Sequence, residues 1–121
     1  MKQHLFRAAE AVMRRFFPPT PLLFAPRLSQ RFGTEVWLKL ESCTPIRTFK
    51  LRGALNKLEA LEREGIRGGV VTASAGNHGL AVARAARLFG RSAVVVVPEG
   101  ANPQKVSLIA AEGRSEEHTS E

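Results

Sequence analysis

The segment from residue 65 to residue 113 contains two strand–turn–helix units in succession, and this repeat limits the possible folds more than any other feature. Residues 69–73 (GVVTA) and 92–97 (SAVVVV) predict two buried strands, because continuous β-branched runs are typical of strands in parallel sheets. Residues 80–88 predict a helix after the first strand, and Asn102-Pro103 predicts the start of a second, with asparagine at the cap and proline in the first position. Two such units predict an α/β fold with a parallel sheet, right-handed crossovers and helices on both faces.

The chain before residue 65 contains shorter elements. Residues 2–16 predict an amphipathic helix that two prolines, at positions 18 and 19, bring to an end. Residues 20–23 (TPLL) are expected to be extended, because a residue before proline is disfavoured in the helical region. Residues 27–32 predict a short helix that ends at Gly33. Residues 35–41 (EVWLKLE) alternate between polar and apolar side chains and predict a strand.

A lysine stands in the first turn of the next predicted helix, which begins within residues 48–54 (TFKLRGA) and runs to about residue 64. Thr48 is a suitable cap, because its hydroxyl can accept a first-turn N–H. Lys50 faces the positive end of the helix dipole, and Arg47 and Arg52 add like charge, so the neutral amine is favoured. A neutral amine is the form that Schiff-base chemistry needs. The alternative is that Lys50 simply projects into water. The helix is predicted from its apolar stripe, which consists of Leu51, Ala54, Leu55, Leu58 and Leu61.

Residues 74–79 (SAGNHG) connect the first predicted strand to its helix. A turn of small residues at a helix N-terminus exposes successive backbone N–H groups, which favours binding of an anion such as a carboxylate. Ser74 and Asn77 add side-chain donors. The alternatives are a tight turn without a ligand and, for His78, a hydrogen-bonded structural histidine. The turn has neither the dinucleotide-binding glycine pattern nor the lysine of a phosphate-binding loop.

Composition excludes several other classes of protein. The 121 residues are 44% hydrophobic and 24% charged, as in an ordinary globular domain. The net charge is +7, but the arginines are scattered and form no basic run, so we expect no nucleic-acid partner. The apolar runs are too short to span a bilayer. A single cysteine, Cys43, excludes an internal disulfide and favours a reducing compartment, so we expect a cytoplasmic protein. The basic N-terminus is weakly similar to a transit peptide, but Glu10 and the lack of serine argue against that assignment.

Several stretches together resemble the tryptophan-synthase-β-like, fold type II pyridoxal-phosphate enzymes, and most of all the serine/threonine dehydratase and serine racemase group. The resemblance covers nearly all of residues 15–113 and implies an incomplete fold of this type. Its motifs are Thr20-Pro21-Leu22, Trp37-Leu38-Lys39-Leu40-Glu41, Thr48-Phe49-Lys50-Leu51-Arg52-Gly53-Ala54, residues 74–79 and Val97-Pro98-Glu99-Gly100.

The resemblance implies a role for each matched residue. Lys50 would be the catalytic residue, which condenses with pyridoxal 5′-phosphate and moves the substrate α-proton. Phe49 would pack beside the cofactor ring and Asn77 would hydrogen-bond its 3-hydroxyl group. The residues implied to hold the carboxylate of a small amino-acid substrate are Ser74, Ala75, Gly76, Asn77 and His78. No residue is expected to bind a metal.

The resemblance implies an ammonia-lyase that removes water from L-threonine or L-serine and yields a 2-oxo acid and ammonia. Racemases of this group carry a second catalytic serine at the position of Ala75, and alanine cannot carry a proton, so elimination is favoured over racemisation. The alternatives are a racemase or β-replacing enzyme of the same fold, or a non-catalytic anion-binding α/β module.

The resemblance also implies that the chain is an N-terminal fragment of a homo-oligomeric parent enzyme. We expect residues 1–64 to belong to the large cofactor domain and residues 65–113 to the small mobile domain. The phosphate-binding loop and the partner of the pyridine nitrogen are expected further downstream, so the fragment alone should be inactive. Residues 114–121 (RSEEHTSE) resemble a translated sequencing adapter, and we predict that they are a non-native tail.

Overall fold

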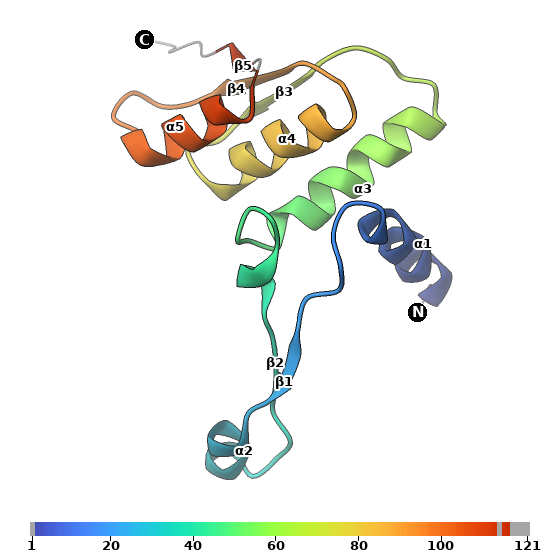
Figure 1. The fold of residues 1–121 in the computed structure, drawn as a ribbon, viewed down its shortest axis with the longest axis vertical. Helices are drawn as coiled ribbons and strands as arrows, with labels where there is room; N and C mark the ends of the chain where they lie inside the picture. The colour runs from blue at the N-terminus through green and yellow to red at the C-terminus, as the bar shows by residue number, and fades with distance from the viewer. Residues whose placement is uncertain (1, 114, 117–121) are drawn as a thin grey trace.

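The computed structural model describes residues 2–113 and the backbone of residues 115–116 (Figure 1). Helices and strands alternate along much of the chain. The elements, in chain order, are α1 (Gln3–Arg14), β1 (Leu22–Phe24), α2 (Pro26–Phe32), β2 (Trp37–Lys39), a 3₁₀ turn (Glu41–Cys43), α3 (Lys50–Arg63), β3 (Val70–Ala73), α4 (Asn77–Leu88), β4 (Ala93–Val96), α5 (Pro103–Ala111) and β5 (Ser115–Glu116).

The helices begin and end close to where the sequence predicts. Gly33 ends α2 in a left-handed conformation, with φ of 63°, which glycine adopts without the steric cost of a side chain. The Asn102 side chain accepts a hydrogen bond of 2.9 Å from the N–H of Gln104 at the start of α5. Helix α4 differs from the prediction, because it begins at Asn77, three residues earlier than expected. The predicted anion-binding turn therefore includes the first residues of the helix itself.

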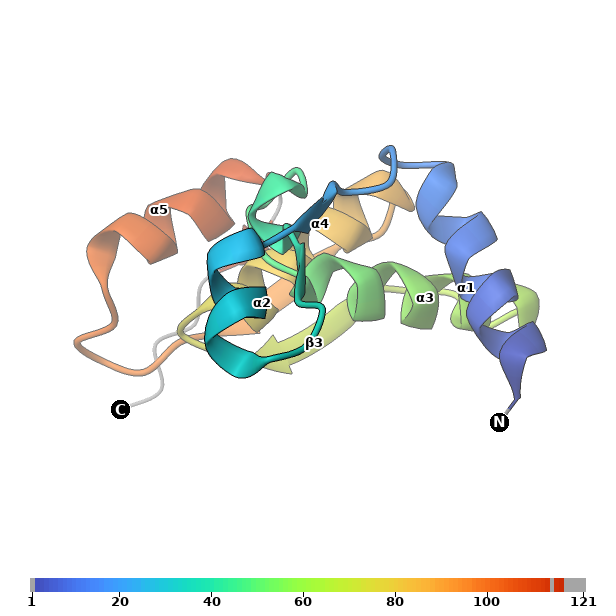
Figure 2. The same cartoon turned by 90° about the horizontal axis from the view of Figure 1, so that it is seen from below.

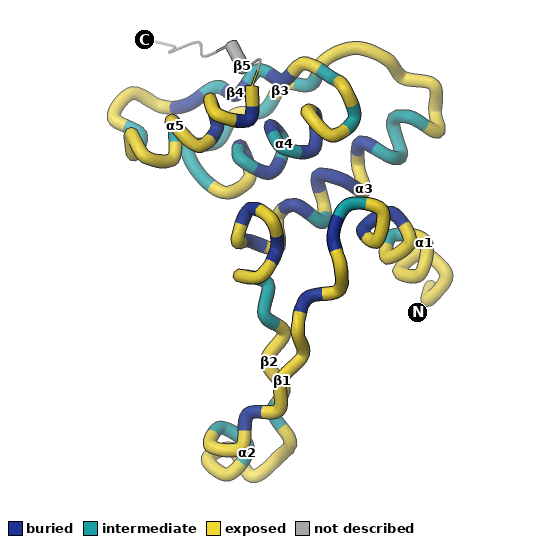
Figure 3. The backbone as a smooth tube through the Cα atoms, viewed as in Figure 1, coloured by how far each residue is buried: buried dark blue, intermediate teal, exposed yellow. Residues whose placement is uncertain are grey.

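Strands β1 and β2 form a two-stranded antiparallel ribbon, which projects from the rest of the molecule together with α2 (Figure 1). Both strands have three residues, and all six are exposed, as the yellow arm in Figure 3 shows. Phe24 and Trp37 are paired across the ribbon, with ring centroids 5.2 Å apart. The strand predicted over residues 35–41 is therefore present but shorter, and it pairs with the segment predicted only to be extended.

The predicted parallel sheet is confirmed. Strand β3 pairs in parallel with β4, from Val70 opposite Ala93 to Ala73 opposite Val96, and α4 connects the two strands. Strand β5 lies on the other side of β4, also in parallel. The architecture is α/β, as the sequence predicts.

Helices of the described chain cover one face of this sheet. Figures 1 and 2 show α4 and α5 on the same side of the strands. On β4, Ala93 and Val95 are buried toward them. On β3, Val71 is 73% exposed and Ala73 is also exposed, so the prediction that β3 is buried is wrong within the described residues. The reason is that no described element lies on the second face, where the fold prediction expected further helices.

The main hydrophobic core lies between α1, α3 and α4. Leu51 and Leu55 of α3 have no exposed surface, which confirms the apolar stripe of the lysine helix. The core joins residues on both sides of the predicted domain boundary, which falls in the loop between α3 and β3. Its buried members are Val12, Met13, Phe17, Ile46, Leu51, Ala54, Leu55, Leu58, Ala81, Ala85, Ala86 and Ala93.

The predicted non-native tail lies outside the described residues, apart from the backbone of residues 115–116 in β5. Among the described helices, none is long and apolar enough to cross a membrane.

Candidate active site

The predicted catalytic lysine is the first residue of α3. Lys50 and Phe49 are both exposed, and the Lys50 Nζ atom lies 5.3 Å from the centroid of the Phe49 ring. The N–H of Lys50 donates to the Thr48 hydroxyl over 3.4 Å, so Thr48 makes the predicted bond to the first turn, although Phe49 is the residue that immediately precedes the helix. The amine is therefore accessible at the start of a well-packed helix.

The loop before α3 is held by Thr44. Its buried hydroxyl donates to the carbonyl oxygen of Thr48 over 2.8 Å and accepts the N–H of the same residue over 2.9 Å. Within this loop, Arg47 has a φ of 61°, in the left-handed region that residues with a side chain rarely adopt. The two Thr44 bonds connect the residues on either side of Arg47 and so fix the path of the chain into α3.

The turn after β3 has a defined shape as well. The N–H of Ser74 donates to Val96 over 2.9 Å, which continues the sheet, and the Ser74 hydroxyl accepts the N–H of Gly76 over 3.2 Å. Gly79 is buried, and a Cβ atom built on it would lie 3.0 Å from both the Ser74 carbonyl oxygen and a Val95 methyl group. The absence of a side chain at Gly79 therefore lets α4 start directly against the sheet.

The N-terminus of α4 suits an anion. No side chain caps it within the described residues, and the first N–H groups of a helix have no partner inside the helix. These groups and the helix dipole favour a negative charge. Ser74, Ala75 and Gly76 are half-buried beside this end, whereas Asn77 and His78 are exposed. All five residues predicted to hold the substrate carboxylate thus lie at one helix terminus.

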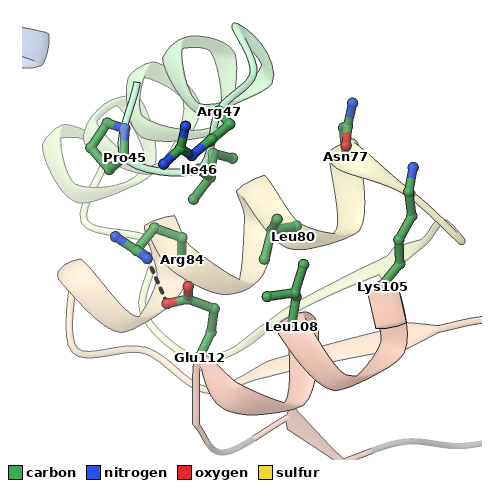
Figure 4. Close-up of a pocket in the computed structure, with 10 residues that line it drawn as sticks. Pro45, Ile46, Arg47, Asn77, Leu80, Arg84, Lys105, Leu108 and Glu112 are labelled. Atoms are coloured by element: carbon green, nitrogen blue, oxygen red, sulfur yellow. Dashed lines mark hydrogen bonds and ion pairs between the residues drawn. The ribbon is translucent and has the colours of Figure 1, made fainter. Parts of the chain in front are cut away.

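The structure brings the two predicted motifs together. Helices α3 and α4 pack side by side, with their N-terminal ends near one another (Figures 1 and 2). A cavity of about 400 Å³ lies between the loop before α3 and the start of α4, and Figure 4 shows Arg47 and Asn77 on its rim. Its lining consists of Pro45, Ile46, Arg47, Gly76, Asn77, Leu80, Arg84, Lys105, Leu108 and Glu112.

A second hollow, of about 340 Å³, lies on the other side of α4. His78 lines it together with Gly53 and Lys57 of α3. Lys50 precedes these two residues by three and seven positions, so it lies on the same face of the helix. The face of α3 that carries Lys50 is therefore the face that meets the His78 side of the turn.

Arg52 has a role that the sequence analysis missed. Its guanidinium group donates to both carboxylate oxygens of Glu41, over 2.6 and 2.9 Å, and to the Thr20 hydroxyl over 3.1 Å. That hydroxyl donates to Glu41 over 2.6 Å, and Lys39 Nζ donates to the Thr20 carbonyl oxygen over 2.6 Å. The sequence predicts Arg52 only as a like charge near Lys50, but in the structure its charge is paired with Glu41. The signal for this pair is the opposite charge of Glu41, in residues 37–41, and Arg52, in residues 48–54.

This network changes the ionisation of its acid. Hydrogen bonding by Arg52 lowers the pKa of Glu41 below its ordinary value of 4.5, against the opposing effect of desolvation and with help from the Thr20 hydroxyl. The same bond to Glu41 raises the pKa of Arg52. Both groups are therefore charged at neutral pH, and the pair is only partly open to solvent, with 33% of the Arg52 side chain and 22% of the Glu41 side chain exposed.

The chain is similar to named proteins in sequence and in structure. It is 48% identical over 79 residues to a chloroplastic biosynthetic threonine dehydratase of Solanum lycopersicum, and the matched segment covers 65% of this chain and 13% of the relative. It is 38% identical over 107 residues to a biosynthetic L-threonine dehydratase of Corynebacterium glutamicum, and the matched segment covers 88% of this chain and 24% of the relative. The solved structure of a maize serine racemase matches 94% of the chain with a TM-score of 0.83 and 35% identity, and the match covers 34% of the racemase.

Both threonine dehydratases are much longer than this chain. The matched segment spans 24% of the Corynebacterium glutamicum enzyme and 13% of the Solanum lycopersicum enzyme. The family model described as "Pyridoxal-phosphate dependent enzyme" matches residues 13–119, which is most of the sequence. The match includes both the lysine helix and the turn at the start of α4. The chain therefore belongs to the family of pyridoxal-phosphate dependent enzymes.

Proposed function

We propose that this chain is the N-terminal part of a longer ammonia-lyase that acts on L-threonine or L-serine. The substrate would lose its α-proton and β-hydroxyl group as water, and hydrolysis of the resulting unsaturated amine would yield a 2-oxo acid and ammonia. The observation that carries this proposal is that the N-terminal ends of α3 and α4 lie near one another (Figures 1 and 2). An exposed primary amine stands at the start of α3, and the start of α4 has no side-chain cap among the described residues, which suits an anion. The similarity to two threonine dehydratases supports the choice of substrate.

The residues present fit pyridoxal phosphate. The cofactor carries an aldehyde, and Lys50 offers an exposed primary amine. A Cβ atom built on Gly53, about one turn after Lys50 on the same face of α3, would meet no atom within 4 Å, so there is open space at that position. Glycine inside a helix costs about 1 kcal/mol relative to alanine, and no described neighbour requires it here. A bound group that needs this space would explain why a glycine is present.

Three residues would hold the cofactor and one would move a proton. Lys50 would condense with the aldehyde, Phe49 would pack beside the ring and Asn77 would hydrogen-bond the 3-hydroxyl group. When bound, the cofactor withdraws electrons from the substrate α-carbon. The Lys50 amine, once released, would take the α-proton, while the turn from Ser74 to His78 would hold the carboxylate and orient the substrate.

Racemisation is the second candidate reaction. The structural similarity to a maize serine racemase favours it. Ala75 argues against it, because a racemase needs a proton donor on the opposite side of the substrate and alanine has none. Elimination therefore remains the proposal.

The proposal also covers the location and assembly of the parent enzyme. Cytoplasmic location rests on the use of a single cysteine, and homo-oligomerisation rests on the family resemblance. The division into a large domain up to residue 64 and a small domain from residue 65 also rests on the family resemblance, and its boundary falls between α3 and β3. The fragment alone is proposed to be inactive, since the phosphate-binding loop is expected beyond it.

Reduction of the cofactor-loaded parent enzyme with borohydride tests the proposal. Borohydride fixes pyridoxal phosphate to the lysine that holds it, and peptide mass spectrometry then identifies that lysine. We expect modification of Lys50 and its loss in Lys50→Ala. Lys57→Ala is the matched control, because Lys57 is exposed on the same face of the same helix and should leave the modification of Lys50 unchanged. Modification that persists in Lys50→Ala would refute the assignment.

A further inference from the structure

We infer that Arg52 is a positioning residue for Lys50, and this inference rests on the function proposed above. Arg52 lies in the first turn of α3, two residues after Lys50. Two residues correspond to a rotation of about 200° around a helix, so the two side chains leave α3 on opposite sides. Arg52 therefore acts through the helix and not by touching the amine.

The contacts of Arg52 fix the start of α3 in two directions. Its bonds to both oxygens of Glu41 form a planar, two-point contact, which resists rotation of the helix about its own axis. Its bond to the Thr20 hydroxyl joins the helix to a second segment of the chain. Thr20 precedes β1 and Glu41 follows β2, so the start of α3 is bonded to the chain on both sides of the ribbon. A single lysine at position 52 could not make these three bonds with the same geometry.

Contacts with buried residues support the same arrangement. The guanidinium carbon of Arg52 lies 5.2 Å from the centroid of the Phe17 ring, and Phe17 is itself buried in the main core. The acceptor side is also anchored, because Thr20 is buried and its carbonyl oxygen accepts Lys39 Nζ. The network thus ties the first turn of α3 to two buried residues, Phe17 and Thr20.

The result is a fixed direction for Lys50. With Arg52 held on one side of α3, the opposite side, which carries Lys50 and Lys57, is the side on which Lys57 and His78 line a common hollow. Attack on an aldehyde and transfer of a proton both depend on the position of the amine, and a displacement of about 1 Å can cost 100-fold in rate. Loosening of the Arg52 contacts should therefore slow the chemistry of Lys50 without removing any group that touches the substrate.

The test compares four substitutions in the full-length parent enzyme, one of which is the conservative change Arg52→Lys. Arg52→Met removes the charge and keeps an apolar stem, and Thr20→Val removes only the hydroxyl that Arg52 and Glu41 share. Arg63→Met is the matched control, because Arg63 lies on the same helix but makes only an exposed ion pair with Glu59. The measurements are the rate of borohydride-trapped modification of Lys50 per folded molecule, the separate values of kcat and KM, and the melting temperature.

We expect Arg52→Met to slow Lys50 modification and lower kcat by about 10- to 100-fold with little change in KM. Thr20→Val should have a smaller effect in the same direction, Arg52→Lys should restore part of the loss, and Arg63→Met should match the wild type. Wild-type rates in both Arg52→Met and Thr20→Val, with only a lower melting temperature, would overturn the inference and leave the proposed function intact. If Arg52→Met does not fold, Thr20→Val decides. A wild-type enzyme that is not modified at Lys50 would overturn the proposed function and this inference together.

Discussion

Gly79 lies so close to Ser74 that a Cβ atom built on the glycine would stand 3.0 Å from the serine carbonyl oxygen. Real Cβ atoms rarely come this near, and the oxygen belongs to the backbone, which cannot move aside as a long side chain can. A side chain at position 79 would therefore push the start of α4 away from the turn. The close contact explains how α4 can begin directly at the end of β3.

The first prediction concerns this contact. Gly79→Ala should destabilise the cofactor-free parent enzyme by about 1–3 kcal/mol, because the added methyl group has no room. Gly53→Ala is the control: it meets no atom within 4 Å and should stabilise the protein by up to about 1 kcal/mol through helix propensity. Urea unfolding midpoints measure both effects. Equal midpoints for Gly79→Ala and the wild type would show that α4 can shift without cost.

The second prediction concerns the core beneath Lys50. Leu55→Ala should lower the free energy of unfolding of the parent by about 2–5 kcal/mol, since Leu55 has no exposed surface and its removal leaves a cavity. Leu5→Ala, at a position that is 55% exposed on α1, should change it by less than about 0.5 kcal/mol. Chemical denaturation with both variants provides the measurement, and similar losses at the two sites would contradict the packing of α3.

The third prediction follows from the lowered pKa of Glu41. A carboxylate whose pKa is lower in the folded state stabilises the protein fully above its ordinary pKa of 4.5, and this contribution is lost as the pH falls through the lowered value. Glu41→Gln should therefore cost about 1–3 kcal/mol at neutral pH, and the difference from the wild type should shrink in acid. Glu99→Gln, at an exposed position, should differ little at any pH. A Glu41→Gln deficit that stays constant down to strong acid would argue against the ion pair.

The fourth prediction concerns reaction specificity. Ala75→Ser places a hydroxyl group in the turn that we propose holds the substrate carboxylate, where racemases of the resembled group carry a serine. We expect the variant parent enzyme to form D-serine from L-serine, which chiral chromatography detects, while Ala75→Gly forms none. Absence of D-serine from an otherwise active Ala75→Ser enzyme would mean that position 75 alone does not decide between elimination and racemisation.

The fifth prediction concerns the 121 residues on their own. The ribbon and α2 expose several large apolar side chains, and Val71 is exposed on the open face of the sheet; on the ribbon they include Leu22, Leu23, Phe24, Trp37 and Leu38. Exposed apolar patches and unpaired strand edges promote association. We expect the isolated chain to aggregate at micromolar concentration, and Phe24→Thr combined with Trp37→Lys to increase its soluble fraction. A cooperatively melting monomer in analytical ultracentrifugation would contradict this expectation.

Local signals predicted much of the fold. Gly33 and Asn102 act within a few residues of their own positions, so the end of α2 and the start of α5 follow from the sequence. The parallel pairing of β3 with β4 follows from the β-branched runs and the intervening helix. The candidate site was predictable because its two motifs each stand at a helix start, although their approach depends on the packing of α3 against α4.

Features that depend on distant segments were not predictable. The pairing of β1 with β2 joins strands on either side of α2, and nothing in either strand specifies that partner. The bonds of Arg52 cross 11 residues to Glu41 and 32 residues to Thr20, so spacing alone does not reveal them. The apolar composition of β3 indicates a strand that is covered on both faces, whereas its exposure depends on which other segments are present.

The early position of the ribbon in the chain has a consequence for synthesis. The ribosome releases β1, α2 and β2 before α3, and none of the later described segments covers them (Figure 3). Their aromatic and aliphatic side chains therefore remain in contact with water while residues 40–113 are being made. A chaperone that binds short apolar strands would meet this arm before α3 and the parallel sheet are complete.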